Sequence, residues 1–539
     1  MKAKATNNTE SVLSRDVTDE TIAKLEGIVG RDNVNTSDLE KILYSHDLAP
    51  LPKEAGVAFK NIPDVVVRPE NDDQVAKIVA LAYKSGIAII PRGNATWGLG
   101  GCMPTHGGIV VDLASRMNDI IEINTEDMYI KAHAGCTWKK AMDECMKLGF
   151  IIGSYPSSFP SGTLGAWIST DGMGTGNYKY GTAKDNILNM KVVLPDGVMI
   201  ETGYDHIGSY MSGYNLNQFF AGSEGTLGVM TTITLRIYPM GEIRPLAYEF
   251  DTLKEIHGPI QKLVNHPSIM PLHISWADHL HFANQRKAGV HSTEANNMLL
   301  VTIQGDPEFL DFEEKAIDAI MEECNAKKFD SDFAMHEWDE RCYEFRARKA
   351  GVGEIPAEVV VPVKNWGEFV DECYGAFDTM NMEAGGVIGV IVDRNTAMFM
   401  PYYFKDDETL LGMAAFSFNF YLGDRAMEYG GRTTGFGVFF AWNLDIIRDE
   451  NTAQFMRELK TAVDPNDVMN PGHLVCGTTR FGIDLTEKIM SFGSQLLQGV
   501  KKLLPADTTF NQNLKRFRYE ELEHGKDGSR TRVLGDGSE

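Results

Sequence analysis

Apolar residues in the first part of the chain follow two alternating patterns, short continuous runs and a helical spacing. Residues 62–70, IPDVVVRPE, contain a run of valines that ends at a proline and predicts a short strand. Residues 71–86 begin with polar residues, carry apolar residues at helical spacing and end in glycine, which predicts a capped helix. Residues 87–93, IAIIPRG, predict a second buried strand. Together the three segments predict a β-α-β unit.

Similar patterns continue up to residue 240. Residues 107–113 and 128–135 predict strands, and residues 136–149 predict a helix that is closed by glycine. Residues 189–203 predict a hairpin that turns at the sequence Pro-Asp-Gly. This part of the chain is therefore expected to add strands, a helix and a hairpin to the β-α-β unit.

The pattern changes after Pro239, where glycine becomes sparse. Residues 252–266 and 308–328 have helical spacing, whereas residues 296–305 and 387–404 predict strands. We therefore expect a second, α+β domain in this part of the chain.

The last part of the chain contains an amphipathic segment. Residues 485–504 have one apolar and one polar face, and the residues after them are polar and predicted to be disordered. The amphipathic segment is expected to pack on its own chain; docking on a partner or a membrane surface is the alternative.

Composition limits the classes of function. The chain has 539 residues, enough for two or three domains, and a net charge of -24, which disfavours nucleic acid or an anionic membrane as the main partner because both repel an acidic surface. The first residues lack the apolar core of a secretory signal, and no apolar run is long enough to span a membrane, so a cytoplasmic location is expected. The seven cysteines include no CxxC pair, so neither an iron–sulfur cluster nor a zinc site is indicated. Electrons leaving such a protein would need a separate carrier.

Three glycine-rich segments indicate where a ligand binds. They are residues 91–101, residues 156–181 and residues 219–228, the last of which holds Glu224 between its glycines. Glycines at such density let backbone N–H groups approach a flat or phosphorylated ligand. None of the segments is a GxGxxG that opens a helix, and none is a GxxxxGKS/T loop, so neither a nicotinamide-type Rossmann site nor an NTPase is indicated.

Four segments in this order, PRGNATWGLGG, TLGAWISTDGMGTG, GSEGTLGV and VDPNDVMNPGHL, resemble the FAD-linked oxidase family. That superfamily includes vanillyl-alcohol oxidase, para-cresol methylhydroxylase, glycolate oxidase D-type subunits and D-lactate dehydrogenases. The resemblance implies FAD as cofactor and an α+β fold, in which a two-subdomain FAD-binding fold of the para-cresol methylhydroxylase type is joined to an α+β cap domain for the substrate. It implies these boundaries: an N-terminal extension at 1–40, the FAD-binding domain at 41–240, the cap at 241–462, a return segment to the FAD domain at 463–480, and the amphipathic segment and tail at 481–539.

Position by position, the resemblance predicts FAD contacts in all three glycine-rich segments. The predicted contacts are Arg92, Gly93, Asn94, Thr96, Gly100, Gly101, Ser161, Thr163, Gly165, Ser169, Gly225 and Thr226. Glu224 is predicted to brace its loop. Some relatives attach the flavin through His, Tyr or Cys, and His106, Cys102 and Cys136 lie near the corresponding loops, but a noncovalent flavin is expected.

The cap departs from the metal-dependent members of the family. Dehydrogenases of 2-hydroxy acids carry the motif HxGDGNxH, whereas the corresponding residues 387–404 contain no histidine, so no metal site is predicted. Residues 429–443, YGGRTTGFGVFFAWN, instead resemble the vanillyl-alcohol oxidase branch, in which an arginine beside the flavin holds negative charge. The matching residue is Arg432.

Three further cap residues are catalytic candidates. Tyr402 and Tyr403 carry phenols that can bind a substrate oxygen or relay its proton, and strand alternation allows at most one of them to face a pocket. His273 is the best candidate base among the histidines, although its apolar, strand-like context favours a core histidine with satisfied hydrogen bonds. Arg346 and Arg348 are candidates for binding a carboxylate.

The sequence therefore predicts an FAD-dependent dehydrogenase or oxidase. Its substrate would be an alcohol, a 2-hydroxy acid or a para-alkyl phenol, which passes a hydride to flavin N5. Two alternatives remain: a redox-neutral flavin enzyme resembling alkyl-dihydroxyacetonephosphate synthase, and a flavin-bearing electron-transfer subunit of a larger complex. The expected partners are a small-molecule substrate, an electron-transfer protein as acceptor and further copies of the chain in a homo-oligomer.

Overall fold

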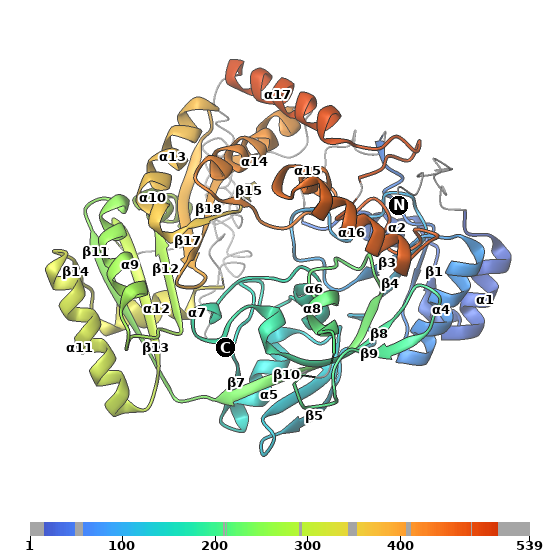
Figure 1. Cartoon of the computed structure of the whole chain (residues 1–539), viewed down its shortest axis with the longest axis horizontal. Helices are drawn as coiled ribbons and strands as arrows, with labels where there is room; N and C mark the ends of the chain where they lie inside the picture. The colour runs from blue at the N-terminus through green and yellow to red at the C-terminus, as the bar shows by residue number, and fades with distance from the viewer. Residues whose placement is uncertain are drawn as a thin grey trace, which may run out of the picture. The chain divides into compact units, whose positions relative to one another are not determined.

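The structure is a computed structural model, and it describes residues 16–48, 58–208, 211, 213–289, 294–342, 353–405, 411–475 and 477–504. The chain divides into two compact units (Figure 1). The first unit contains residues 1–243, 304–307 and 435–493, and the second contains residues 244–303, 308–434 and 494–539. The first unit therefore resumes at Gly435, within the segment that the sequence assigned to the cap.

A four-stranded sheet forms one half of the first unit. Strands β2 (Val65–Val67), β4 (Ile109–Asp112) and β3 (Ile89–Arg92) are parallel, and the short β1 (Val34–Asn35) pairs antiparallel with β2. Helix α4 (Asp72–Ser85) connects β2 to β3, which confirms the predicted β-α-β unit.

Helix α4 shows how local sequence sets the boundaries of that unit. The side chain of Asn71 accepts a hydrogen bond from the N–H of Gln74 and caps the first turn. Gly86 ends the helix with a φ of 66°, a left-handed conformation that favours glycine. Between these caps, Val75, Ile78, Val79 and Ala82 are buried, as the helical spacing predicted.

An antiparallel sheet of six strands forms the other half of the first unit. Its order is β5-β6-β10-β8-β9, with β7 also paired to β10. The strands are β5 (Ile120–Asn124), β6 (Tyr129–His133), β7 (Phe150–Ile152), β8 (Ile187–Val193), β9 (Met199–Glu201) and β10 (Val229–Pro239). The pairing of β8 with β9 confirms the predicted hairpin.

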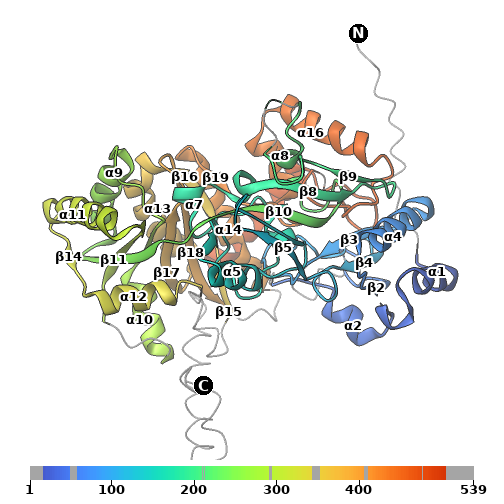
Figure 2. The ribbon, with the colours of Figure 1, turned by 90° about the horizontal axis from the view of Figure 1, so that it is seen from below.

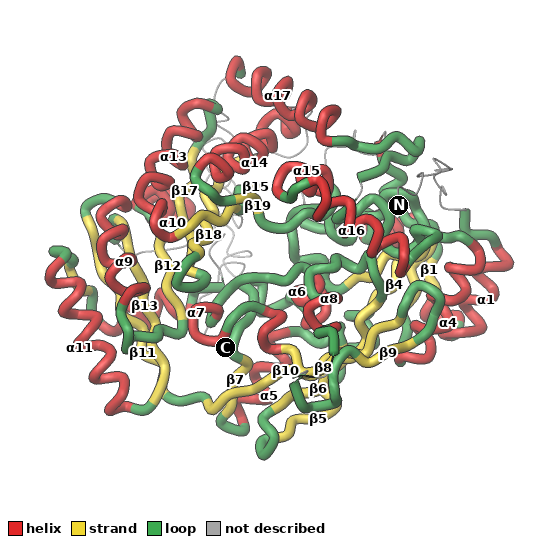
Figure 3. The backbone as a smooth tube through the Cα atoms, in the orientation of Figure 1, coloured by secondary structure: helices red, strands yellow, loops and turns green. Residues whose placement is uncertain are grey.

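The helices of this unit are mostly short and are separated by long loops (Figure 3). Besides α4 they are α1 (Asp19–Val29), α2 (Asp38–Leu43), α5 (Trp138–Lys147), α6 (Leu164–Ser169), α7 (Asn177–Tyr180), α8 (Leu216–Phe220), α15 (Leu444–Ile447) and α16 (Glu450–Val463). Helix α17 (Glu487–Leu503) begins in this unit and ends in the second.

A nine-stranded sheet is the centre of the second unit. Its order is β14-β11-β13-β12-β17-β18-β16-β19, with β15 also paired to β18. The strands are β11 (Glu242–Phe250), β12 (His273–Ala277), β13 (Asn297–Gly305), β14 (Lys327–Lys328), β15 (Gly353–Pro356), β16 (Val359–Pro362), β17 (Ala384–Ile391), β18 (Thr396–Lys405) and β19 (Arg432–Thr433). The helices are α9 (His257–Asn265), α10 (His279–Ala288), α11 (Pro307–Glu323), α12 (Ser331–Asp339), α13 (Trp366–Thr379) and α14 (Leu411–Glu428).

Helices cover both faces of this sheet, with α9 and α13 on one side and α10 and α12 on the other (Figure 2). Trp276 and Phe399 pack against Trp366 of α13 and therefore face the α13 side. Tyr402 contacts His281 of α10 and faces the opposite side.

Candidate active site

The first glycine-rich loop leaves its backbone donors unused. It follows β3, at the carboxyl end of the parallel strands. Among the residues that the structure describes, the N–H groups from Gly93 to Cys102 donate no hydrogen bond. A run of unspent donors in a glycine-rich turn forms a concave surface that binds an anion such as a diphosphate.

The side chains of this loop instead hold it in place. Asn94 donates from Nδ2 to the carbonyl of Ser161 at 2.7 Å, and Thr96 donates to the hydroxyl of Ser158 at 3.1 Å. Arg92 lies over the ring of Tyr44, 4.9 Å from its centre. Asn94 and Thr96 thereby join the first loop to the second, and their contacts with FAD stay predictions.

The second loop meets the first at Gly93 and Thr163. A Cβ atom at Gly93 would lie 2.2 Å from Thr163 Oγ1, so any other residue at this position would displace the Thr163 hydroxyl. Thr163 is the N-cap residue of α6, but its hydroxyl makes no capping bond and is a buried polar atom with no partner in the described protein. A ligand group or an ordered water can satisfy this buried hydroxyl.

Glycine is also required where α6 crosses the neighbouring strand. The N–H of Gly165 donates to the carbonyl of Ala134 at 2.8 Å, and a Cβ atom at Gly165 would lie 2.8 Å from the Ala134 side chain. At the end of α6, the Ser169 hydroxyl donates to the carbonyl of Ala166. Gly165 therefore brings the second loop close to the sheet, whereas the Ser169 hydroxyl stays within its own helix.

The third loop has a left-handed backbone at its centre. Glu224 has a φ of 48° and Gly225 has a φ of 72°, and Gly225 lies against Pro91 of β3. The hydroxyl of Ser223 is buried and has no partner among the described residues, whereas the hydroxyl of Thr226 donates to the Ser223 carbonyl at 2.7 Å. Ser223, which the sequence did not single out, is therefore a better placed hydroxyl for a ligand than Thr226.

Glu224 braces this loop, as predicted. Its carboxylate is 6% exposed and accepts hydrogen bonds from the N–H groups of Phe436 at 3.1 Å and Gly437 at 2.9 Å. Burial raises the pKa of Glu224 to about 7, and the two N–H groups oppose this shift because they stabilise the carboxylate. Glu224 is therefore occupied by protein partners and does not serve as a substrate base.

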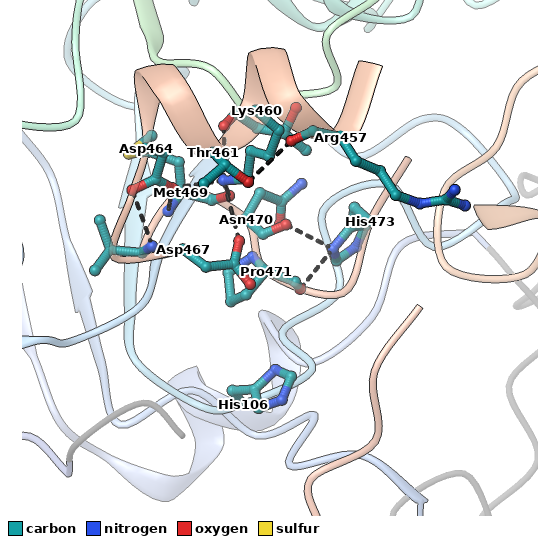
Figure 4. A network of polar contacts seen from close by, with 12 residues as sticks. His106, Arg457, Lys460, Thr461, Asp464, Asp467, Met469, Asn470, Pro471 and His473 are labelled. Atoms are coloured by element: carbon teal, nitrogen blue, oxygen red, sulfur yellow. Dashed lines mark hydrogen bonds and ion pairs between the residues drawn. The ribbon is translucent and has the colours of Figure 1, made fainter. Parts of the chain in front are cut away.

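The return segment completes the cradle (Figure 4). Met469 pairs with Ile89 of β3 as an isolated bridge. The side-chain amide of Asn470 donates to the carbonyls of Gly101 at 3.0 Å and Glu224 at 2.7 Å, which ties the first loop to the third. Asn470 has a φ of 41°, a conformation that asparagine tolerates better than most residues.

A buried ion pair holds the base of the return segment. Lys460 of α16 donates to the carboxylate of Asp464 at 2.5 Å, and also to the carbonyls of Thr226 and Met469. Asp464 in turn accepts the N–H groups of Val468 and Met469. Since every charge in this pair has further hydrogen bonds, the pair can be buried without a large loss of stability.

His473 lies beneath the first loop. Its Nε2 is 2.9 Å from the carbonyl of Gly100, and its Nδ1 is 3.0 Å from the carbonyl of Pro471. Burial lowers the pKa of His473 although the neighbouring carbonyls favour the charged ring. Gly100 itself has a φ of 78°, so its carbonyl can turn inward to this histidine.

The four candidate catalytic residues all lie on the nine-stranded sheet of the second unit. Cross-strand pairing puts Ser275, Val390, Met398, Val360 and Arg432 in one row, so their side chains share a face.

Alternation along β12 and β18 adds His273 and Tyr402 to the face that carries Arg432, and puts Tyr403 on the other face. The ideal rise per residue and spacing between strands put the Cα atoms of Arg432 and Tyr402 about 16 Å apart. The same spacings put the Cα atom of His273 about 20 Å from each of them.

The environments of these four residues differ. Arg432 is exposed, whereas Tyr402 and Tyr403 are buried. The Tyr402 hydroxyl lies 2.9 Å from His281 Nδ1, and the Tyr403 hydroxyl donates to Asn419 at 3.1 Å.

His273 is also buried and lies beside Trp338. Its surroundings lower its pKa to about 3, mainly through desolvation and also through the nearby Arg341. Arg346 and Arg348 lie outside the described residues.

The cradle in the first unit fits FAD. Unspent N–H groups of the first loop suit a diphosphate, and the partnerless hydroxyls of Thr163 and Ser223 lie in the adjoining loops. Two family models match the chain in order, an FAD binding domain at residues 63–203 and the C-terminal domain of FAD linked oxidases at residues 243–474. The chain belongs to the FAD-linked oxidase family. It is an FAD-dependent oxidoreductase.

Curated relatives of this FAD-linked oxidase cover most of its length. It is 27% identical over 489 residues to D-lactate dehydrogenase (cytochrome) 1, mitochondrial, of Saccharomyces cerevisiae, which covers 84% of this chain and 79% of that protein. It is 26% identical over 486 residues to glycolate oxidase subunit GlcD of Bacillus subtilis, which covers 87% of this chain and 98% of that protein. Among solved structures, substrate-bound p-cresol methylhydroxylase matches with a TM-score of 0.75 at 18% identity, over 86% of this chain and 98% of that one. The last likeness confirms the predicted fold.

The described part of this FAD-linked oxidase contains no group of three or more His, Cys, Asp or Glu side chains that could hold a metal ion. No helix in the same residues is both long and apolar enough to cross a bilayer.

Sequence reasoning missed Ser223, Lys460 and His473 as parts of the cradle. Ser223 lies in the third glycine-rich segment, but no local rule distinguishes its hydroxyl from that of Thr226. Lys460 and His473 lie outside the glycine-rich segments, and only the resemblance of the return segment pointed to their region.

Proposed function

We propose that this oxidoreductase removes a hydride from a carbon that carries a hydroxyl or is benzylic to a phenol, and that Arg432 and Tyr402 bind the substrate. The substrate class is a 2-hydroxy acid, another alcohol or a para-alkyl phenol. The observation that carries the proposal is the shared face of Arg432 and Tyr402 on the sheet of the second unit. When bound, FAD supplies the hydride acceptor at N5.

Arg432 supplies the positive charge that this chemistry requires. A guanidinium binds a carboxylate or phenolate through paired hydrogen bonds and keeps its charge at any physiological pH. Phe436 lies four positions after Arg432 in the chain. Its N–H donates a hydrogen bond to Glu224 of the third glycine-rich loop. Because each residue spans at most about 3.6 Å, the covalent chain keeps the Cα atoms of Arg432 and Phe436 within about 14 Å.

Tyr402 supplies the polar group at the other end of the proposed site. Its phenol can donate a hydrogen bond to a substrate oxygen, while the adjacent His281, whose Nε2 accepts from Gln285, can donate from Nδ1 to the phenol oxygen 2.9 Å away. Tyr403 and His273 are set aside, because Tyr403 faces the other side of the sheet and His273 lies far from Arg432 along the same face.

Anaerobic mixing of the FAD-loaded protein with a substrate panel tests this proposal. The panel contains D- and L-2-hydroxy acids, primary alcohols and para-alkyl phenols, and loss of oxidised-flavin absorbance reports reduction. Arg432→Ala is expected to retain FAD and slow its reduction by about 100-fold or more, with partial recovery in Arg432→Lys. Loss of FAD, or an unchanged rate, would contradict the role of Arg432. Flavin that is needed for turnover but is never reduced would favour the redox-neutral alternative.

We further propose that an electron-transfer protein accepts the electrons. The yeast relative is named for cytochrome, which supports an acceptor of that class. Stopped-flow reoxidation of the reduced enzyme by cytochrome c should be much faster than reoxidation by dissolved oxygen. A faster reaction with oxygen would identify an oxidase instead.

A further inference from the structure

Helix α17 exposes a continuous apolar stripe. Ile489, Phe492, Leu496, Val500 and Leu503 are between 41% and 88% exposed. At 100° per residue, these five positions fall within an arc of about 80° around the helix axis. The stripe therefore runs along the whole length of the helix on one side.

The opposite face of α17 is polar and buried. Ser494, Gln498 and Lys501 are at most 8% exposed. Lys501 donates from Nζ to the carbonyl of Asn381 at 2.6 Å, and the amide of Asn381 donates to the carbonyl of Lys502 at 2.9 Å. A helix that packs only on its own chain buries its apolar face. In α17 the polar face is buried and the apolar stripe is exposed, so we infer that another surface binds the stripe.

The exposed charges of α17 that lie nearest the stripe are positive. Lys488 and Lys502 are exposed and flank the same edge of the stripe, 220–260° from Ile489 at about 100° per residue. The one acidic residue of α17, Glu487, is also exposed, but it lies about 160° from Ile489 around the helix axis and therefore away from the stripe. In a chain with a net charge of -24, this helix is a local positive site.

We propose that α17 lies in the plane of a lipid bilayer surface, with the apolar stripe at the acyl boundary and with Lys488 and Lys502 at anionic headgroups. In-plane amphipathic helices combine an apolar face with flanking lysines, and anionic lipid attracts such lysines. Phe481 and Ile483, which precede the helix in sequence, are 64% and 55% exposed.

A second copy of the chain is a weaker candidate for the cover. Stable protein interfaces use about 20–30 residues on each side, far more than the stripe offers. Antiparallel pairing of two α17 helices would also bring Lys488 of one copy near Lys502 of the other, and like charges at short range are unfavourable.

Vesicle sedimentation of the full-length, FAD-loaded protein tests the proposal. The probes are phosphatidylcholine vesicles with and without one quarter phosphatidylglycerol. The double variant Phe492→Glu, Leu496→Glu is compared with Phe455→Glu, Leu39→Glu, which changes the same residue types at sites that are 59% and 71% exposed on other helices. We expect the stripe variant to bind anionic vesicles at least about ten-fold more weakly and the control variant to bind like the wild type, because a carboxylate at the acyl boundary is costly.

The lysines give an independent readout. Lys488→Gln, Lys502→Gln should lose the preference for anionic vesicles and keep its FAD absorbance. The proposal is overturned if the wild type binds neither vesicle, or if both double variants lose binding equally. It is also overturned if light scattering shows a dimer that the stripe variant alone dissociates, or if vesicles bind only after residues 505–539 are removed.

Discussion

The side-chain amide of Asn470 donates a hydrogen bond to the backbone carbonyl of Glu224 at 2.7 Å, across 246 positions of sequence. The same amide donates to the carbonyl of Gly101 at 3.0 Å. One side chain of the return segment thus fixes the distance between two loops of the FAD cradle. The cradle is therefore a product of both ends of the chain.

Asn470→Asp should weaken FAD binding and lower stability. The carboxylate has the same shape and tolerates the left-handed backbone, but it cannot donate to the two carbonyls. We expect a loss of about 2–5 kcal/mol in the free energy of unfolding, since two buried acceptors lose their partner and face a negative charge. Denaturant titration and flavin fluorescence measure the two effects. Asn451→Asp, at an exposed position of α16, is the control and should change neither quantity appreciably.

Gly93→Ala should abolish tight FAD binding, whereas Gly98→Ala in the same loop should be tolerated. An added Cβ at Gly93 would lie 2.2 Å from Thr163 Oγ1, but at Gly98 the nearest atom would be 3.9 Å away. The ratio of flavin to protein absorbance in the purified variants measures the outcome. Equal flavin content in both variants would show that the first and second loops need not meet at Gly93.

Glu224 should make stability depend on pH. Burial raises its pKa from the ordinary 4.5 to about 7, so the folded chain binds this proton more tightly than the unfolded chain does. The contribution of Glu224 to stability is therefore complete below pH 4.5 and is lost as the pH rises toward 7. Melting temperatures between pH 5 and 8 should fall more steeply for the wild type than for Glu224→Gln. Parallel curves for the two proteins would contradict the raised pKa.

Lys460→Met should destabilise the first unit by about 3–5 kcal/mol, because it leaves the buried carboxylate of Asp464 without its cation. Lys77→Met is a matched control, since Lys77 forms an exposed pair with Asp73 at the same four-residue spacing. The control should cost less than about 1 kcal/mol. Chemical denaturation of both variants, with and without added FAD, compares them.

Tyr402→Phe and Tyr403→Phe should separate catalysis from packing. Both remove one hydrogen bond of a buried hydroxyl and should each cost about 1 kcal/mol of stability. Only Tyr402 shares a face with Arg432, so only Tyr402→Phe should slow flavin reduction. Equal rates in both variants, measured by anaerobic stopped flow with any active substrate, would exclude Tyr402 from the site.

Local patterns in the sequence predicted the elements of the first unit well, because caps and apolar spacing act over a few residues. The helix between Asn71 and Gly86 is an example, since both of its caps are visible in the sequence. The brace at Glu224 was also predicted. Its partners Phe436 and Gly437 were not, because no short-range rule links residues more than 200 positions apart.

The candidate site in the second unit was predicted only as separate residues. Strand alternation alone showed that Tyr402 and Tyr403 point to opposite faces. The choice between them required the register of β16, β18 and β19, which pairs Val360 with both Met398 and Arg432. Register depends on pairing partners that lie far apart in sequence, so it could not be read from the pattern of any one strand.

The hydrogen bonds of Asn470 and His473 to the first glycine-rich loop also bear on how the protein is made. Residues 89–228 leave the ribosome long before the return segment does. At about 5–20 residues per second, some 240 further residues take roughly 12 to 50 seconds to synthesise. Until then the loops lack the hydrogen bonds from Asn470 and His473. We therefore expect FAD to bind late, when synthesis of the chain is almost complete. A nascent chain that stalls before residue 470 should leave an apoprotein that added FAD cannot rescue.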